Sequence, residues 1–191
     1  MSKIQAAPGR PGEDTRGGFS HGGWAAPYDA MQSREAAPDM SNLGALLARR
    51  TYEDLYGYWP KQTGSPFTAA LNDIPKYVAS TTLKEPLAWR NSTSLKGDVP
   101  AAVAKLKQQP GKDLVIMGSG ELVRSLMQHN LIDAYMLLTH PVVLGAGLRL
   151  FDDSSPVTTL RLVEAKSTDK GVVVATYVPD TSALGKGASD G

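Results

Sequence analysis

Cysteine is absent from this chain of 191 residues. Its absence excludes disulfides, thiolate nucleophiles and thiolate-ligated metal sites together. Histidine is scarce as well, with three scattered residues, so the sequence predicts no metal site. Thiol and metal chemistry are therefore outside the functions that this sequence predicts.

The chain also lacks an excess of charge of either sign and a long apolar run. Its formal net charge is +1, which gives no electrostatic reason to expect nucleic acid or an anionic membrane as a partner. No apolar run approaches the roughly 20 residues that span a bilayer. The first 18 residues have no apolar signal-peptide core, and they carry acidic residues that a transit peptide avoids. We therefore expect a cytoplasmic protein.

Composition divides the chain into three parts. Residues 1–24 are rich in Gly and Pro and show no helical or strand period, so we interpret them as an N-terminal loop segment. Residues 25–180 are predicted to form one domain, since 41% apolar and 20% charged residues are typical of a globular chain. Residues 181–191 are mostly small and predict a flexible tail.

Within the predicted domain, strand and helix patterns alternate and predict an α/β fold. Apolar runs and helical spacing predict strands over 44–48, 76–80, 114–117 and 132–139, and helices over 51–58, 66–71, 99–108 and 120–129. Near the end, residues 159–166 and 171–178 flank a polar turn and predict an antiparallel hairpin. The order strand, glycine turn, helix and strand across 114–139 predicts a parallel crossover unit.

A glycine turn, Gly118-Ser119-Gly120, joins a predicted strand to a predicted helix. Glycines permit close approach of a phosphate to the backbone, and the start of a helix presents unpaired N–H groups. The turn is not a dinucleotide fingerprint, because Val123 stands where the third glycine belongs. In a second interpretation Ser119 simply caps the helix, and Glu121 offsets part of its dipole. Both interpretations remain open on these residues alone.

Two arginines precede the next helix start. Thr51 and Asp54 fit a capping box that begins the helix at Thr51. Arg49 and Arg50 then stand just before that start, where they can reach a phosphate by bidentate contacts. In the alternative interpretation they are solvated arginines that pair with Glu53 or Asp54.

Three small hydroxyl residues, Ser80-Thr81-Thr82, follow a third predicted strand. Hydroxyl groups at a strand end can contact a polar ligand. Such residues also commonly just end strands, so this motif indicates little by itself.

Several unrelated motifs follow one another along the chain: GGFSHGGWAAPY (17–28), GALLARRTYEDLYGYWP (44–60), KYVASTTL (76–83), WRNSTSLKGDVPAAVAKLKQQPGKDLVIMGSGELVRSLMQHNLID (89–133) and LLTHPVVLGAGLRLF (137–151). In this order and spacing, the chain resembles the dihydrofolate-reductase-like family over most of residues 17–178. That family includes the reductase domain of bifunctional riboflavin-biosynthesis enzymes.

The resemblance implies a three-layer α/β sandwich with a mixed, mostly parallel central sheet and a C-terminal antiparallel hairpin. It also implies an NADPH-dependent reductase of a pterin-, pyrimidine- or related heterocyclic substrate, of the dihydrofolate reductase or 5-amino-6-(5-phosphoribosylamino)uracil reductase type. A homodimer is implied as well, in which the hairpin 159–178 could extend a sheet across the interface.

The resemblance also implies which residues hold the coenzyme. The pyrophosphate would lie on Gly118, Ser119, Gly120, Glu121 and Leu122. Arg49, Arg50 and Thr51 would hold phosphate, and Ser80, Thr81 and Thr82 would lie near the adenosine 2′-phosphate.

The chain departs from the family pattern at two points that matter for function. Thr81 stands where family members often have arginine, and a hydroxyl lacks the charge and fork of a guanidinium, so NADH stays open beside NADPH. Of the apolar strand with which family members begin, Ile4 alone is left in residues 1–6. The alternative function is therefore a catalytically silent relative that keeps the nucleotide pocket for binding or dimerisation.

Hydride transfer requires positioning, exclusion of water and often a proton source. We expect the catalytic residues on the early loop, at His21, Tyr28 and Asp29. The imidazole of His21 suits proton donation because its ordinary pKa lies near neutrality. In the alternative interpretation it is a solvated loop histidine. We interpret His140, at a strand end, as structural.

Overall fold

The computed structural model describes residues 18–28, 43–63, 66–111, 113–117, 119–153 and 155–180. Two compact units are present, one of residues 38–131 and one of residues 1–37 with 132–191. We call them the parallel unit and the antiparallel unit after the sheets that they contain. The predicted tail 181–191, most of the predicted loop segment 1–24 and the position of the family's first strand lie outside the described residues.

The parallel unit is built on four strands, β1 (Leu43–Ala48), β2 (Lys76–Ala79), β3 (Ser92–Leu95) and β4 (Asp113–Ile116). Their order is β3-β2-β1-β4, and every neighbouring pair runs parallel. Five of the six residues of β1 are buried, because a strand inside a parallel sheet is covered on both faces and must be apolar throughout. The run Leu-Gly-Ala-Leu-Leu-Ala meets that requirement.

Four helices accompany this sheet in the sequence, α1 (Arg49–Tyr58), α2 (Pro66–Asp73), α3 (Val99–Lys107) and α4 (Gly120–Met127), and a 3₁₀ turn, η4 (Trp59–Lys61), follows α1. A core cluster joins α1 and α2 to the sheet through the buried side chains Leu47, Tyr52, Leu71 and Val78. The backbone N–H of Trp89 donates to the hydroxyl of Tyr52 at 2.9 Å, which satisfies a polar group inside this core.

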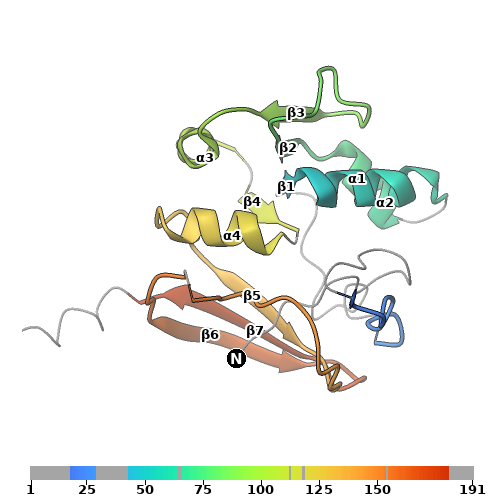
Figure 1. The fold of residues 1–191 in the computed structure, drawn as a ribbon, viewed down its shortest axis with the longest axis vertical. Coiled ribbons are helices and arrows are strands. Elements are labelled where there is room, and N and C mark those ends of the chain that lie inside the picture. The colour runs from blue at the N-terminus through green and yellow to red at the C-terminus, as the bar shows by residue number, and fades with distance from the viewer. Residues whose placement is uncertain are drawn as a thin grey trace, which may run out of the picture. The chain divides into compact units, whose positions relative to one another are not determined.

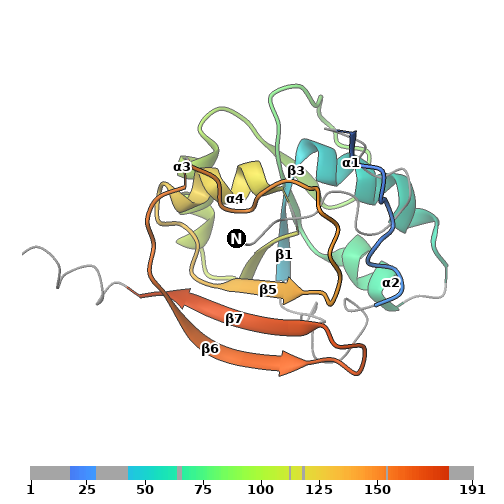
Figure 2. The same cartoon turned by 60° about the horizontal axis from the view of Figure 1, so that its bottom comes forward.

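The antiparallel unit contains β5 (Tyr135–Thr139), β6 (Leu160–Ser167) and β7 (Val173–Pro179) in the order β5-β7-β6. Figure 2 shows the three strands side by side in this order. β6 and β7 form the predicted hairpin, which closes where the N–H of Thr168 donates to the carbonyl of Val172 at 2.8 Å. The register shifts between Leu162 and Glu164, so Val163 is the extra residue of a β-bulge.

Most predicted elements are confirmed within a few residues, as Figure 1 shows in outline. Strand β3 was not predicted, because Ser-Thr-Ser-Leu has no apolar period. The predicted crossover is wrong in its second half: β5 pairs antiparallel with β7, and among the described strands it does not pair with β4. Local order along the chain shows that a helix separates two strands, but not which neighbours each strand selects.

The early loop, residues 18–28, is held by aromatic contacts within the antiparallel unit. The rings of Trp24 and Tyr28 contact the imidazole of His140 edge to face, at centroid distances of 4.9 and 5.3 Å. The Tyr28 hydroxyl donates to the carbonyl of Pro141 at 3.3 Å. His140 is therefore structural, as the sequence predicted. Burial lowers its pKa, although a backbone hydrogen bond at Leu138 acts in the opposite direction.

Lys76 is fully buried in the parallel unit. Its ammonium donates to the carbonyls of Leu71 at 2.9 Å, Ile74 at 2.8 Å and Asn72 at 3.3 Å. It also lies 4.7 Å from the ring centroid of Trp89, close enough for a cation–π contact. One side chain thus satisfies the carbonyls at the end of α2 and joins that helix to the start of β2.

The charge state of Lys76 should make stability depend on alkaline pH. Burial first, and Arg90 second, lower its pKa from 10.5 to about 8, while Asp73 acts in the opposite direction. Between these values the unfolded chain holds a proton that the folded chain has lost, so stability rises with pH. From about pH 7.5 to about pH 9.5 the free energy of unfolding should rise by about 2 kcal/mol more in the wild type than in Lys76→Met. Urea unfolding measures the free energy of unfolding of both proteins at each pH. Equal pH profiles would contradict the lowered pKa of Lys76.

His140 should make the stability of the fold depend on pH in the acid range. Because its folded pKa lies below the ordinary 6.5, the unfolded chain takes up this proton first, and stability falls as pH drops below about 6.5. His140→Phe keeps a ring against Trp24 and Tyr28 without the titration. The urea midpoint of the wild type should therefore fall faster with acid than that of the variant, and parallel profiles would show that His140 does not titrate as described.

Candidate functional site

The three junctions singled out in the sequence lie at one edge of the parallel sheet. β2, β1 and β4 are adjacent and parallel, with Ala48 beside Ala79 and Leu46 beside Ile116. Parallel strands end at the same edge, so the segments that follow all three strands begin there. Ligands of open α/β sheets bind outside this carboxyl edge.

At the first junction, the helix begins without a loop. α1 starts at Arg49, directly after β1, and its N-cap Ala48 forms no side-chain cap hydrogen bond. The predicted capping box is therefore wrong: Thr51 lies inside the first turn, because β1 leads straight into the helix two residues earlier. Since alanine has no side-chain acceptor, the first amides of α1 keep their capacity to bind an anion.

The two arginines of this junction differ. Arg49 donates through Nη1 to both carboxylate oxygens of Glu53, at 3.0 and 2.8 Å. Arg49 thus forms the helix-surface ion pair of the alternative interpretation, and its contact with a phosphate stays a prediction. Arg50 is exposed at the same helix start.

At the second junction, Ser80 builds the turn. Its side chain is 8% exposed, and its hydroxyl oxygen accepts from the N–H groups of Thr82 at 3.2 Å and Leu83 at 3.1 Å. The structural interpretation therefore accounts for this hydroxyl. Thr81 and Thr82 are exposed and present their side chains to solvent.

At the third junction, Ser119 caps α4. Its oxygen accepts from the N–H of Leu122 at 3.3 Å, and its φ of 71° lies in the left-handed region. The capping interpretation is confirmed, and the amides of Gly120 and Glu121 still stand at the helix start. The side chain of Leu122 is buried, so Leu122 can meet a ligand only through its backbone. Gly118 lies outside the described residues.

The predicted catalytic residues belong to the antiparallel unit. His21 is exposed and touches the ring of Phe19 edge to face, at 5.7 Å between centroids. The hydroxyl of Tyr28 is engaged with Pro141. Asp29 lies outside the described residues. Of the two described residues, His21 is the more exposed.

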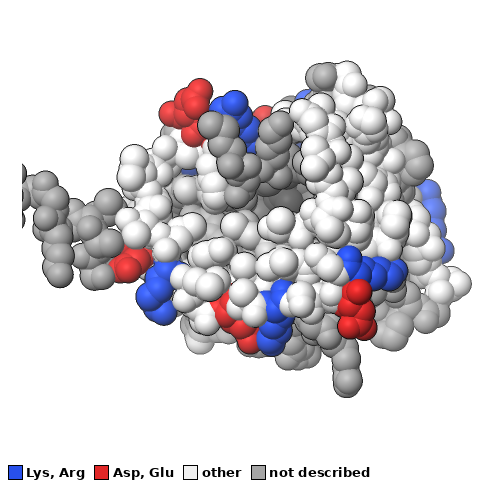
Figure 3. Space-filling model, turned by 90° about the horizontal axis from the view of Figure 1, so that it is seen from below, with Lys and Arg blue, Asp and Glu red and all other residues white. Residues whose placement is uncertain are grey.

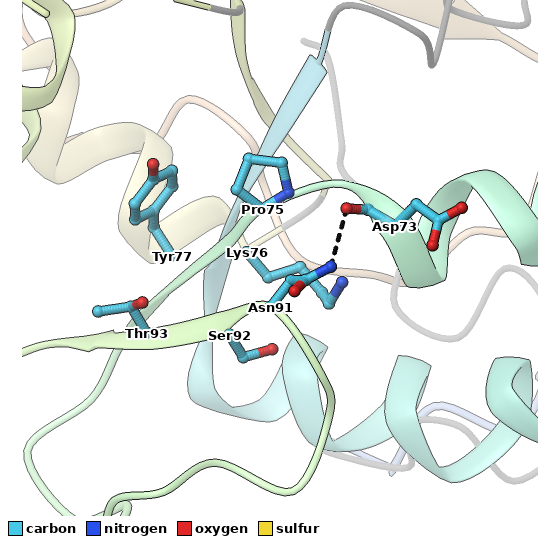
Figure 4. A pocket seen from close by; sticks show the side chains of 7 residues that line it. All are labelled: Asp73, Pro75, Lys76, Tyr77, Asn91, Ser92 and Thr93. Carbon is cyan, nitrogen blue, oxygen red and sulfur yellow. Dashed lines mark hydrogen bonds between the residues drawn. The ribbon is translucent and has the colours of Figure 1, made fainter.

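A shallow hollow of about 480 Å³ lies elsewhere, at the amino ends of β2 and β3, and Figure 4 shows it from close by. Its rim is tied together where Asn91 Nδ2 donates to the carbonyl of Asp73 at 3.0 Å, and Arg90 pairs with the Asp73 carboxylate at 2.6 Å. None of the predicted site residues lines it. The sequence patterns do not predict this network; its one signal is Lys76, a lysine at the start of an otherwise apolar strand.

The described residues contain no group of three or more His, Cys, Asp or Glu side chains that could hold a metal ion. Nor do they contain a helix long and apolar enough to cross a membrane.

Comparison with known sequences places the chain in a family. The profile of the RibD C-terminal domain matches residues 6–174. YyaP of Bacillus subtilis (strain 168), an uncharacterised protein, is 29% identical over 143 residues, which are 72% of this chain and 75% of YyaP. YwjB of the same strain, also uncharacterised, is 39% identical over 72 residues, or 38% of this chain and 41% of YwjB.

Solved structures show the same fold. A protein of Shewanella sp. PV-4, whose name assigns it provisionally to riboflavin biosynthesis, has a TM-score of 0.60 at 20% identity and covers 74% of this chain and 76% of its own. A pyrimidine reductase-like protein from Corynebacterium diphtheriae has a TM-score of 0.52 at 12% identity, and the match covers 72% of this chain and 75% of that protein. Dihydrofolate reductase from Enterococcus faecalis, solved with NADP(H), has a TM-score of 0.50 at 13% identity, and the match covers 73% of this chain and 75% of the reductase.

These likenesses confirm the predicted dihydrofolate-reductase-like α/β fold, in which a parallel four-stranded sheet and an antiparallel three-stranded sheet are present. At such low identities they bear on the fold alone. The sequence match is the stronger finding, because the profile spans most of the 191 residues. The chain belongs to the RibD C-terminal domain family.

Proposed function

We propose that this chain is a reductase that binds a reduced nicotinamide dinucleotide at the carboxyl edge of its parallel sheet. The proposed substrate is a pterin, a pyrimidine or a related heterocycle. The observation that carries the proposal is the meeting of three junctions at one sheet edge, with two helix starts among them. Relatives with this fold include a pyrimidine reductase-like protein and a dihydrofolate reductase solved with NADP(H).

The phosphates would be held largely by backbone groups. The first amides of α1 and the amides of Gly120 and Glu121 are donors at the positive ends of two helices. Arg50 adds an exposed guanidinium beside the first of them. Ser80 and Ser119 would act indirectly, because each hydroxyl already accepts backbone hydrogen bonds that shape its turn.

Charge near the adenosine would decide between NADPH and NADH. Thr81 and Thr82 supply hydroxyls without charge, but β3 ends beside β2, with Leu95 opposite Ala79. Lys96, the next residue, is exposed and stands at the same edge. We assign to its ammonium the part that arginine at position 81 plays in the family, so NADPH is the proposed coenzyme.

The bound coenzyme would supply the hydride, and the chain would supply positioning and a proton. His21 is the proposed proton source, because its imidazole is exposed on the early loop. Tyr28, whose hydroxyl is engaged, would position that loop. Asp29 remains a candidate of the same loop.

Arg50→Gln should weaken NADPH binding. Loss of a charged hydrogen bond to phosphate costs about 1.5–3 kcal/mol, which is about 10- to 100-fold in the dissociation constant. Arg90→Gln is the matched control, because Arg90 pairs with Asp73 at the opposite, amino edge of the sheet, and it should bind NADPH as the wild type does. Isothermal titration calorimetry gives the NADPH dissociation constants of the wild type and both variants. Equal losses of NADPH affinity in the two variants would contradict the proposed site.

Coenzyme preference should follow charge at this edge. Lys96→Gln should lower the preference for NADPH over NADH, and Thr81→Arg should raise it, each by about tenfold. The two dissociation constants of each variant give the ratio. Variants that weaken the binding of NADPH and NADH equally would show that these residues do not recognise the 2′-phosphate.

Turnover is tested separately, by the loss of the 340-nm absorbance of NADPH over a panel of pterins and flavin precursors. Substrate-dependent oxidation supports a reductase. Binding without oxidation would favour the catalytically silent relative. Absence of binding would overturn both.

A further inference from the structure

Glu53 holds the side chain of Arg49 at the start of α1. Nη1 of Arg49 donates to both carboxylate oxygens of Glu53, at 3.0 and 2.8 Å. The two side chains are 39% and 44% exposed, so packing alone does not fix them. Side chains of a helix lean towards its N-terminus. The Glu53 carboxylate therefore reaches back to Arg49 and keeps its guanidinium beside the first turn.

The place of this ion pair distinguishes it from others on the surface. Acidic and basic side chains also lie beside each other elsewhere on the described surface, as on the face in Figure 3, and exposed pairs generally add little to stability. Arg49, however, is the first residue of α1 and follows β1 directly. The pair thus lies at the carboxyl edge of the parallel sheet, where the proposed coenzyme binds.

Glu53 engages one corner of the guanidinium and leaves the rest free. A guanidinium carries its N–H groups on Nε, Nη1 and Nη2, in a fixed planar fork. Within the described part of the chain, Nη1 donates to Glu53, and neither Nε nor Nη2 donates to any partner. The N–H groups of Nε and Nη2 point in parallel and fit two oxygens of one phosphate. The ion pair and a phosphate can therefore share Arg49.

An arginine that is already fixed binds phosphate at a lower entropic cost. A free arginine side chain has many rotamers, and a ligand must restrict them on binding. The pairing with Glu53 has already restricted them in Arg49. The same carboxylate also brings a negative charge near the diphosphate, and this charge opposes binding. Because the two effects have opposite signs, the removal of the carboxylate shows which of them is larger.

We infer that Glu53 is a positioning residue for the coenzyme: its carboxylate fixes the Arg49 guanidinium so that Nε and Nη2 donate to one phosphate of the diphosphate. Glu53 itself does not touch the coenzyme. The phosphate contact of Arg49 coexists with the ion pair and does not replace it. This inference rests on the proposed function, because it concerns the same site.

Glu53→Gln tests the inference by the sign of its effect. The variant lacks the charge that repels the diphosphate, so NADPH binding would strengthen if repulsion were all that Glu53 contributes. Loss of positioning should instead raise the NADPH dissociation constant about three- to tenfold in isothermal titration calorimetry. Asp73→Asn is the matched control, because Asp73 is an exposed acid that pairs with Arg90 at the opposite edge of the sheet. It should bind NADPH as the wild type does.

A double-mutant cycle with Arg49 separates positioning from charge. In an Arg49→Gln background Glu53 has no guanidinium to position, so Glu53→Gln should no longer weaken NADPH binding. The urea midpoint of Glu53→Gln should stay at the wild-type value, because an exposed ion pair adds little to stability. A loss of affinity then reports on the site and not on the fold.

The outcomes distinguish this inference from the proposed function. A wild type that binds NADPH while Glu53→Gln binds it equally well or more tightly would overturn the inference and leave the proposed function standing. The same holds if Glu53→Gln weakens binding equally in the presence and in the absence of Arg49. A wild type that does not bind NADPH would overturn the proposed function and the inference together.

Discussion

The parallel pairing of β1 with β2 on one side and β4 on the other is the constraint on which the candidate site depends. β1 can occupy this central place because its run of Leu, Gly and Ala residues is apolar on both faces. Once the three strands run in one direction, their following segments must begin at a common edge. Segments that are far apart in the sequence, near positions 50, 80 and 119, thereby follow adjacent strands at the same edge of the sheet.

Several polar side chains at that edge form hydrogen bonds or ion pairs within the protein and so shape the turns and helix starts there. Ser80 and Ser119 accept backbone hydrogen bonds, and Arg49 pairs with Glu53. What is left for a ligand is mainly backbone amides, with Arg50 as the exposed cation of the α1 start. Such a site favours phosphate over a particular base or ring, because amides at helix starts recognise negative charge.

Sequence reasoning succeeded where the pattern is local. Apolar runs such as Leu43–Ala48 and the turn-flanked hairpin of β6 and β7 carry their own signal, and they are confirmed. It failed where tertiary contacts decide. β3 is held as a strand by its pairing with β2 rather than by its Ser-Thr-Ser-Leu composition. The predicted capping box does not form, because α1 begins directly after β1, two residues before Thr51. The buried role of Lys76 depends on three carbonyls that spacing along the chain does not reveal. The roles assigned to His21 and to the coenzyme-binding residues stay predictions.

Binding of a reduced nicotinamide dinucleotide at the carboxyl edge of the parallel sheet can be followed residue by residue, through the amide chemical shifts measured by NMR during a titration with NADPH. We expect saturable shifts at Arg49, Arg50 and Thr51 and at Gly120 and Glu121, with little change at the amino edge around Tyr77 and Thr93. Saturable shifts confined to the amino edge, or to the antiparallel unit, would contradict it.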